Sequence, residues 1–358
     1  MVASEPEPVA PQAVSHRTTA ALRSVRSHLR RFGLHLLIFA LLAFLLFRFI
    51  PSLAQALGSL ERVSWLWLLA ALGLETLSEI GYVVAWRRIV DPGRVLEQEG
   101  RGRRLDARLA WAQLGGGLLV PAGSFSGVGA GAVLLHRCGL PLKTVTEREF
   151  NLSFLNTAID ALALIVFGVL LGLGLLAGRN DVALTFLPAA FAAGAIGAAI
   201  LIARRADRFA ARLEPRRPRI AEGIGTVARA VEDTDSLLFG RGDWRSLGGA
   251  LAYLFFDVLV LWTAFFALHT HGAPPFAPVL MAYIIGALGG SLPLPAGLGA
   301  VGGIGGCLIL YGAGHNVAVG AAVVYGAVGL VVPFVGGLAA YLLLTRQLRN
   351  LRRSAGEQ

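Results

Sequence analysis

Long apolar runs alternate with short arginine-rich segments along most of the chain. Each run is long enough for a helix to cross roughly 30 Å of hydrocarbon at about 1.5 Å per residue. The predicted membrane-spanning helices are residues 32–50, 64–86, 150–178, 184–203, 247–270 and 318–343. The pattern therefore predicts an all-α integral membrane protein with about six full spans.

Two further apolar regions, 107–137 and 277–312, carry nearly the same ten letters: LGGGLLVPAG from Leu114 and LGGSLPLPAG from Leu288. Proline ends a helix, and glycine permits a sharp reversal of the chain. Either arm of these regions has only about 15 residues, fewer than the roughly 17 that a span requires. We therefore expect two re-entrant helical hairpins, each entering and leaving the membrane on one side.

Arginine placement predicts the orientation of the spans. Segment 87–108 holds seven arginines and 204–246 holds ten, whereas 51–63 holds one and 271–276 none. The positive-inside rule then places both termini in the cytoplasm of a multi-pass protein, which we expect in the bacterial cytoplasmic (inner) membrane. The two hairpins enter from opposite sides, which is the inverted-topology repeat of secondary transporters.

The expected organisation has seven parts. They are a disordered cytoplasmic tail (1–31), a first transmembrane anchor (32–50), a first repeat (64–178) with hairpin 107–137, a transmembrane helix (184–203), a basic cytoplasmic or interfacial segment (204–246), a second repeat (247–343) with hairpin 277–312, and a cytoplasmic tail (344–358). The net charge of +10 does not indicate nucleic acid, because the cations lie in blocks between the apolar runs.

The hairpin tips have a chemical property of their own. After each tip a half-helix begins near the midplane, and the free N–H groups of a helix N-terminus attract anions. The predicted phosphate-binding residues are Pro121, Gly123, Ser124, Ser126, Gly127, Pro295, Gly297 and Gly299. The alternative is that these glycines only permit close helix packing.

Four acids lie well inside predicted spans: Glu75, Glu79, Asp160 and Asp257. A central charge costs roughly 2.5–3.5 kcal/mol on insertion scales, so such residues usually face the bundle interior and serve a function. Glu75 and Glu79 are four residues apart on one helix face, and as like charges we do not expect both to ionise easily.

Asn151 and Asn156 enter the same helix as Asp160 and add hydrogen-bonding groups. For this polar set three functional roles stay open: protonated acids, coupling to H⁺ or Na⁺, and contact with a cationic part of the substrate. The structural alternative is hydrogen bonding between helices by neutral acids.

Other residues predict less. Trp86, Arg87 and Arg88 at the end of a span are typical of an interfacial anchor, and the two arginines are candidates for contact with lipid head groups. Cys138 and Cys307 have no metal-binding or disulfide spacing. The motifs HExxH and GxSxG and the P-loop are absent, so we expect a transporter without catalytic residues, metal or cofactor.

The chain also resembles a known family. The sequences that carry this resemblance are AWRRIV, LGGGLLVPAG followed by HRCGLPL, NTAIDALALIVFG, LPLPAGLGAVGG and YGAVGLVVPFVGG. They are similar to the flippase-like integral membrane family that includes the transmembrane region of lysylphosphatidylglycerol synthase. The resemblance implies movement of lipids between leaflets and matches Asp160 to the family's aspartate in the span after the first hairpin.

The chain departs from this family at several charged positions. Where relatives carry a glutamate after each tip, it has Ser126 and Gly129 in the first hairpin and Gly302 in the second. The family's tyrosine–arginine pair reads Tyr325-Gly326. These departures point to a different lipid or a different coupling.

We therefore expect a flippase for an amphipathic, phosphate-containing lipid, such as a phospholipid, an aminoacyl-phospholipid or a polyprenyl-phosphate-linked lipid. The expected partners are membrane lipids, with coupling to H⁺ or Na⁺ and homo-oligomerisation left open. One alternative is a secondary transporter of a small soluble or ionic substrate. Another is a structural or regulatory membrane subunit that transports nothing.

Overall fold

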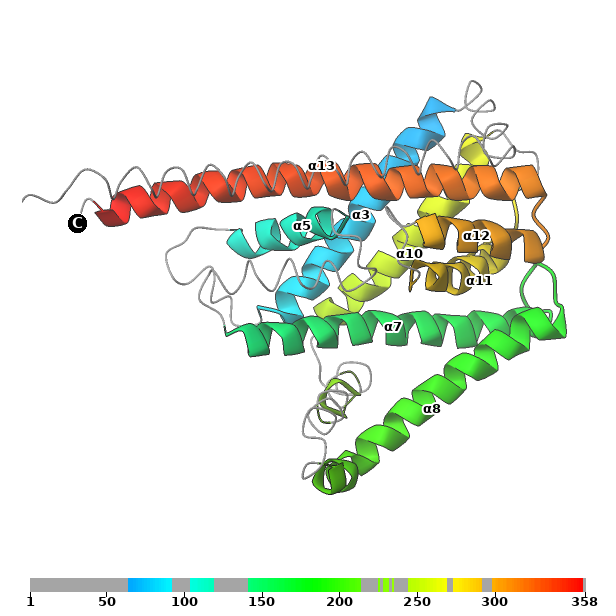
Figure 1. Cartoon of the computed structure of the whole chain (residues 1–358). Coiled ribbons are helices and arrows are strands. Elements are labelled where there is room, and N and C mark those ends of the chain that lie inside the picture. The colour runs from blue at the N-terminus through cyan, green and yellow to red at the C-terminus, as the bar shows by residue number, and fades with distance from the viewer. Residues whose placement is uncertain are drawn as a thin grey trace, which may run out of the picture. The chain divides into compact units, whose positions relative to one another are not determined.

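A computed structural model describes residues 64–91, 104–118, 141–213, 225, 228–231, 234, 244–268, 273–291 and 298–356, all within the unit Gln55–Gln358. In this part of the chain every regular element is a helix (Figure 1), so the prediction of an all-α fold is confirmed for it. The helices are α3 (Trp65–Ile89), α5 (Leu105–Leu118), α7 (Leu142–Gly172), α8 (Val182–Leu213), α10 (Trp244–Ala267), α11 (Phe276–Ala287), the 3₁₀ helix η2 (Leu288–Ser291), α12 (Leu298–Leu310) and α13 (His315–Gly356).

Five of these helices are long and apolar enough to cross a membrane. They comprise Trp65–Ile89, Lys143–Gly172, Val182–Ala206, Trp244–Ala267 and His315–Leu344. Each overlaps one of the predicted spans, while the first predicted span, 32–50, lies outside the described residues. The total number of spans stays a prediction.

Helix α7 differs from the predicted span 150–178 at both ends. It begins at Leu142, because the polar sequence before residue 150 is already helical, and it ends at Gly172. The chain then turns at Gly174, whose φ of 71° is in the left-handed region. The Gly174 and Leu175 amides donate to carbonyls of the last helical turn at 3.0 Å. A glycine in this conformation commonly terminates a helix. The residues after it are also apolar, so hydrophobicity alone extends the predicted span beyond the true end of the helix.

Helices α3 and α10 cross at a pair of glycines. A Cβ atom added to Gly81 would lie 2.7 Å from the Gly249 carbonyl oxygen, and one added to Gly249 would lie 2.7 Å from the Gly81 oxygen. The backbones therefore touch without intervening side chains, as small residues permit between membrane helices. Close by, Ser78 Oγ donates to the Tyr253 carbonyl oxygen at 2.9 Å. This contact fixes the position of one polar face of α3 against α10.

The predicted hairpins fall partly within the described residues. Helices α11 and α12 have 12 and 13 residues, and each is too short to span. They pack so closely at Gly286 and Gly303 that a Cβ atom on either would overlap the other helix's backbone. Residues 292–297 between them lie outside the described residues, as do residues 119–140 of the first region. Both re-entrant hairpins stay predictions.

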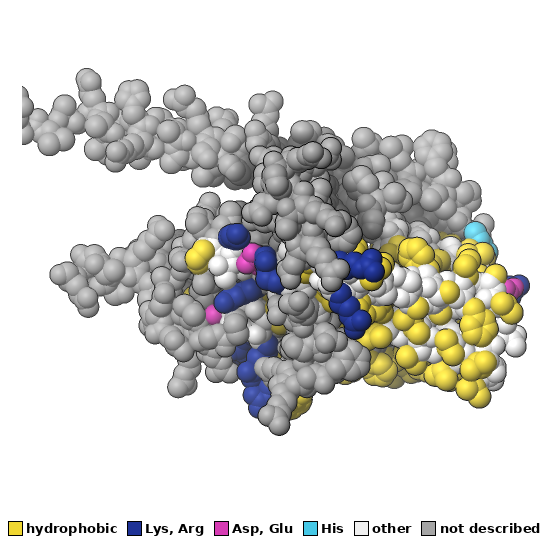
Figure 2. All heavy atoms as spheres, turned by 90° about the horizontal axis from the view of Figure 1, so that it is seen from below, with side chains coloured by type: hydrophobic (Ala, Val, Ile, Leu, Met, Phe, Trp, Pro, Cys, Tyr) yellow, Lys and Arg dark blue, Asp and Glu magenta, His cyan; other side chains and the backbone are white. Residues whose placement is uncertain are grey.

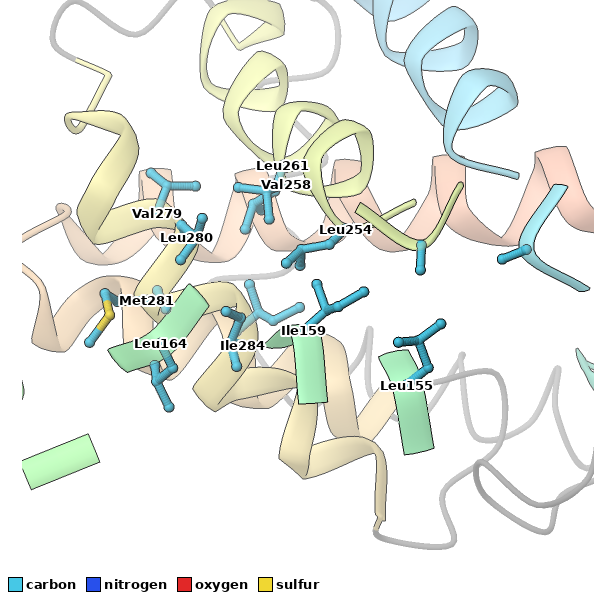
Figure 3. Close-up of a cluster of buried hydrophobic side chains, with 14 of the residues drawn as sticks. Leu155, Ile159, Leu164, Leu254, Val258, Leu261, Val279, Leu280, Met281 and Ile284 are labelled. Atoms are coloured by element: carbon cyan, nitrogen blue, oxygen red, sulfur yellow. The ribbon is translucent and has the colours of Figure 1, made fainter. Parts of the chain in front are cut away.

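The apolar core lies where α7 packs against α10 and α11 (Figure 3). Its labelled members are Leu155, Ile159 and Leu164 from α7, Leu254, Val258 and Leu261 from α10, and Val279, Leu280, Met281 and Ile284 from α11. Because α10 and α11 contribute to this core, their polar residues are held in fixed positions beside it.

Candidate functional site

Carboxyl and phenol groups from four helices meet beside this core. Glu75 and Glu79 come from α3, Asp257 from α10, Tyr283 from α11 and Tyr325 from α13. We call these five residues the carboxyl–tyrosine cluster. Its acids are almost fully buried, with 4% of Glu75, 4% of Glu79 and 6% of Asp257 exposed.

Asp257 is the residue on which the cluster converges. The Tyr283 hydroxyl donates to Asp257 Oδ2 at 2.5 Å, and the Tyr325 hydroxyl donates to the same oxygen at 3.3 Å. The two tyrosine rings meet edge to face, with centroids 5.9 Å apart. Helices α10, α11 and α13 are therefore joined through one carboxyl group.

Three other carboxyl oxygens of the cluster are buried without matching donors. Glu75 Oε2, Glu79 Oε2 and Asp257 Oδ1 form no hydrogen bond to a donor. The described residues include no arginine or lysine that forms an ion pair with these acids. An unsatisfied buried polar group costs about 1–3 kcal/mol, and a charged one costs more. The cluster therefore has unused capacity to bind a proton or a small cation.

Glu75 links the acids of α3 to Asp257. The carboxyl groups of Glu75 and Asp257 lie within hydrogen-bonding reach of each other, and Glu79 is close enough for its charge to act on Glu75. A hydrogen bond between two carboxyl groups requires a proton on one of them. The geometry therefore allows Glu75 and Asp257 to share one proton across the boundary between α3 and α10.

The predicted polar residues of α7 approach this cluster from another side. Asp160 is partly buried; it lies close enough to Asp257 for the charge of Asp257 to act on it, and its own charge acts on Tyr283. Asn156 lies one turn earlier, with its Oδ1 buried and without a donor. Asn151 is half-buried nearer the start of the helix. The structure thus brings all four predicted intramembrane acids into one region.

Most of the predicted phosphate-binding residues cannot be placed in this geometry. Gly299 is buried, and its carbonyl oxygen lies directly against Gly289. The others, Pro121, Gly123, Ser124, Ser126, Gly127, Pro295 and Gly297, lie outside the described residues. Phosphate binding at the hairpin tips stays a prediction.

A second polar network joins α3, α5 and α7. Trp86 Nε1 donates to Glu149 Oε1 at 2.8 Å and to Gln113 Oε1 at 3.0 Å. Gln113 Nε2 donates to Glu149 Oε2 at 2.9 Å. All three side chains are buried, so Trp86 is not the interfacial anchor that its position at the end of a span predicted. This burial could not be predicted from the sequence, because a tryptophan beside two arginines usually lies at the membrane surface.

The first of the two arginines after Trp86 is paired with an acid of the protein itself. Arg87 Nε donates to Asp106 Oδ2 at 2.5 Å, and the Asp106 carboxylate is buried while 30% of the Arg87 side chain is exposed. Arg88 is half-buried. Contact of both arginines with lipid head groups stays a prediction. The Arg87 guanidinium is already bound on one side by Asp106 of α5.

The sequence did not identify Tyr283, Gln113 or Glu149 as site residues. Tyr325 was noted only at a position of family resemblance. Glu149 stands in a polar stretch before an apolar run, where an acid normally faces water. A usable signal exists for Tyr283, which is the one polar side chain of α11, whereas α13 contains two tyrosines, Tyr325 and Tyr341, that the sequence does not distinguish.

Replacing Glu149 with leucine is expected to destabilise the protein by about 1–3 kcal/mol, because Gln113 Nε2 loses its close acceptor and Trp86 Nε1 loses one of two. The control is Glu147→Leu, two residues earlier, where the exposed pair with Arg229 at 3.2 Å contributes less than about 1 kcal/mol. Thermal unfolding of the purified proteins in detergent measures both. Equal melting temperatures for the two variants would contradict a structural role for the Glu149 network.

Comparison with known families and proteins adds evidence of a different kind. A family model described as the lysylphosphatidylglycerol synthase TM region matches residues 22–337, which include α3 to α12 and most of α13. No curated protein matches the chain. The family and the apolar helices together indicate a multi-pass membrane protein connected with lipid handling. By the extent of this match, the chain belongs to the lysylphosphatidylglycerol synthase transmembrane-region family.

Proposed function

We propose that this protein moves an amphipathic, phosphate-containing lipid between the two leaflets of the bacterial cytoplasmic membrane. In this proposal both termini are cytoplasmic, and protonation of the carboxyl–tyrosine cluster drives the change of conformation. The observation that carries the proposal is the set of buried carboxyl oxygens without donors, Glu75 Oε2, Glu79 Oε2 and Asp257 Oδ1. Buried acids in membrane helices are costly and typically mark ion or substrate pathways.

The position of the cluster suits a coupling role. Glu75 and Glu79 belong to the first predicted repeat, whereas Asp257, Tyr283 and Tyr325 belong to the second. Alternating access in inverted-repeat transporters is a movement of one repeat against the other. A proton taken up between the repeats changes the free energy of their contact, so it shifts the equilibrium between two arrangements.

A proton suits the cluster better than Na⁺ does. Within the described helices, no three acidic, histidine or cysteine side chains are grouped closely enough to hold a metal ion. A shared proton between Glu75 and Asp257 needs only two facing carboxyl groups. With that proton in place, the Tyr283 hydroxyl still donates to Oδ2 of Asp257.

The test is lipid translocation by the full chain in proteoliposomes. Vesicles carry a fluorescent anionic phospholipid, and an impermeant quencher added outside reports the label that reaches the outer leaflet. We expect faster exchange than in protein-free vesicles, and a further increase under an imposed pH gradient. An equal increase under a Na⁺ gradient at constant pH would assign the coupling to Na⁺ and contradict protonation.

The same vesicles can test the alternative reading. Uptake of a small water-soluble cation or anion without lipid movement would contradict lipid transport and favour a soluble substrate. Vesicles in which neither lipid nor solute moves, with correctly folded protein, would favour a non-transporting subunit.

A further inference from the structure

A groove lies between α7 and α8, lined by residues outside the carboxyl–tyrosine cluster. It has a volume of about 390 Å³ and is lined mostly by alanine, leucine, isoleucine and phenylalanine side chains. From α7 the lining includes Phe154, Ala158 and Ala161, and from α8 it includes Ala195 and Ala199. The small residues on both helices make the space, since an alanine leaves most of the gap between two helices unfilled.

The groove exists because the two helices touch at one end and diverge toward the other (Figure 1). At the closed end, a Cβ atom on Gly168 would lie 2.8 Å from the Thr185 carbonyl oxygen and 3.0 Å from the Ala189 side chain. Toward the N-terminal half of α7 and the C-terminal half of α8 the helices separate. Val231 and Thr234, both buried, complete the lining at this open end.

The length of the groove matches one leaflet. Its lining on α8 extends from Ala195 to Arg204, a rise of roughly 14 Å along the helix at about 1.5 Å per residue. Half of a hydrocarbon core of about 30 Å is nearly the same length. A groove that ran the whole thickness would instead suit a partner helix. The observed length suits a single acyl chain that ends near the midplane.

Among the described lining residues the charged one, Arg204, lies at the wide end of the groove. Thr157, Thr234 and Arg204 are its polar lining residues, and Arg204 is exposed at the end of the apolar part of α8. None of the described acids forms an ion pair with Arg204. Figure 2 shows the same division on a larger scale, with hydrophobic side chains over one part of the described surface and lysine and arginine side chains gathered at its border. The charge at this end complements an anionic phosphate.

We propose that this groove binds an anionic diacyl phospholipid, with one acyl chain between α7 and α8 and the phosphate paired with Arg204. The chain fills the apolar part of the groove, which faces the membrane because α8 is largely unburied. The guanidinium holds the head group at the level where membrane proteins place arginine, at the edge of the hydrocarbon. The lipid is bound whether or not the protein transports it, so the inference extends beyond the proposed function.

The test is photolabelling of the full chain in vesicles that contain a phosphatidylglycerol with a diazirine near the end of one acyl chain. We expect labelled peptides from both α7 and α8 at the groove. Arg204→Gln is expected to lower this labelling about fivefold, the loss of one charge contact with an anionic lipid (about 1 kcal/mol). Ala199→Trp fills the groove and is expected to remove the labelling almost completely.

Two matched variants keep the test specific. Arg205→Gln removes the adjacent exposed arginine, and Ala198→Trp places the same bulk on the neighbouring residue; neither residue lines the groove. Both are expected to label like the unaltered protein. A phosphatidylcholine with the same photoactive chain carries the same phosphate beside a cationic choline group, so it should label the groove less than the phosphatidylglycerol does.

Three results would overturn the proposal. They are labelling spread evenly over the exposed face of α8, equal labelling by the two lipids, and equal effects of Ala199→Trp and Ala198→Trp. Lipid translocation measured in the same vesicles tests the proposed function separately from the binding site. Groove labelling without lipid movement would contradict lipid transport and support the binding site.

Discussion

Asp257→Asn is expected to lower the rate of lipid translocation at least about tenfold. Asparagine keeps the size of the side chain and one oxygen that accepts the hydroxyls of Tyr283 and Tyr325. It cannot take up a proton or share one with Glu75. Hydrogen bonds to charged groups are worth about 1.5–3 kcal/mol, and about 1.4 kcal/mol corresponds to a factor of ten in rate. The initial rate of fluorescence quenching in proteoliposomes measures this loss.

The structural alternative, neutral acids that only join helices, gives a different result. Asparagine would then replace the protonated aspartate with little change in rate. We expect the Asp257→Asn protein to melt no lower than the unaltered protein, because the substitution removes a buried carboxyl oxygen that lacks a donor. The control Glu147→Gln alters a partly exposed acid outside the cluster and should keep the full rate. Unchanged transport in Asp257→Asn would remove the basis for the coupling proposal.

Gly81→Leu is expected to destabilise the fold by about 3 kcal/mol or more, at the upper end of the range for overpacked cores. The first carbon atom of the new side chain would already meet the Gly249 carbonyl oxygen at 2.7 Å and the Tyr253 amide nitrogen at 2.9 Å. Both atoms belong to the backbone, so the helices α3 and α10 must separate. Separation also strains the bond from Ser78 Oγ to the Tyr253 oxygen and moves Glu75 away from Asp257.

Gly73→Leu on the same helix is the matched control. Nothing lies within 4 Å of a Cβ atom at Gly73, and the position is exposed. Leucine favours the helix over glycine by up to about 1 kcal/mol, so this variant should melt at the same temperature or higher. Thermal unfolding in detergent, followed by size-exclusion chromatography, compares the two. A Gly81→Leu protein as stable as Gly73→Leu would show that the glycine crossing does not hold α3 and α10 together.

The candidate site could be predicted from the sequence only in part. Glu75, Glu79 and Asp257 were identified because an acid inside an apolar run has to face the interior of the bundle. Tyr283 and Tyr325 were not, since a phenol suits a membrane interface, a core or a buried hydrogen bond equally well. The distinction depends on whether another helix brings an acceptor to the hydroxyl. Trp86 shows the same limitation, with its acceptors supplied by α5 and α7.

The sequence by itself determined the helical class, the approximate position of five apolar helices and the burial of the acids. These follow from local composition, because hydrocarbon excludes unpaired backbone and charge wherever they stand in the chain. Only the tertiary structure decided that α3, α10, α11 and α13 bring their polar groups to Asp257, and that α7 and α8 diverge into a groove. Both depend on where glycines let backbones touch, as at Gly81 with Gly249 and at Gly168 with Thr185. A glycine in an apolar run does not reveal which backbone it will meet, since its partner is distant in the sequence and is chosen by packing.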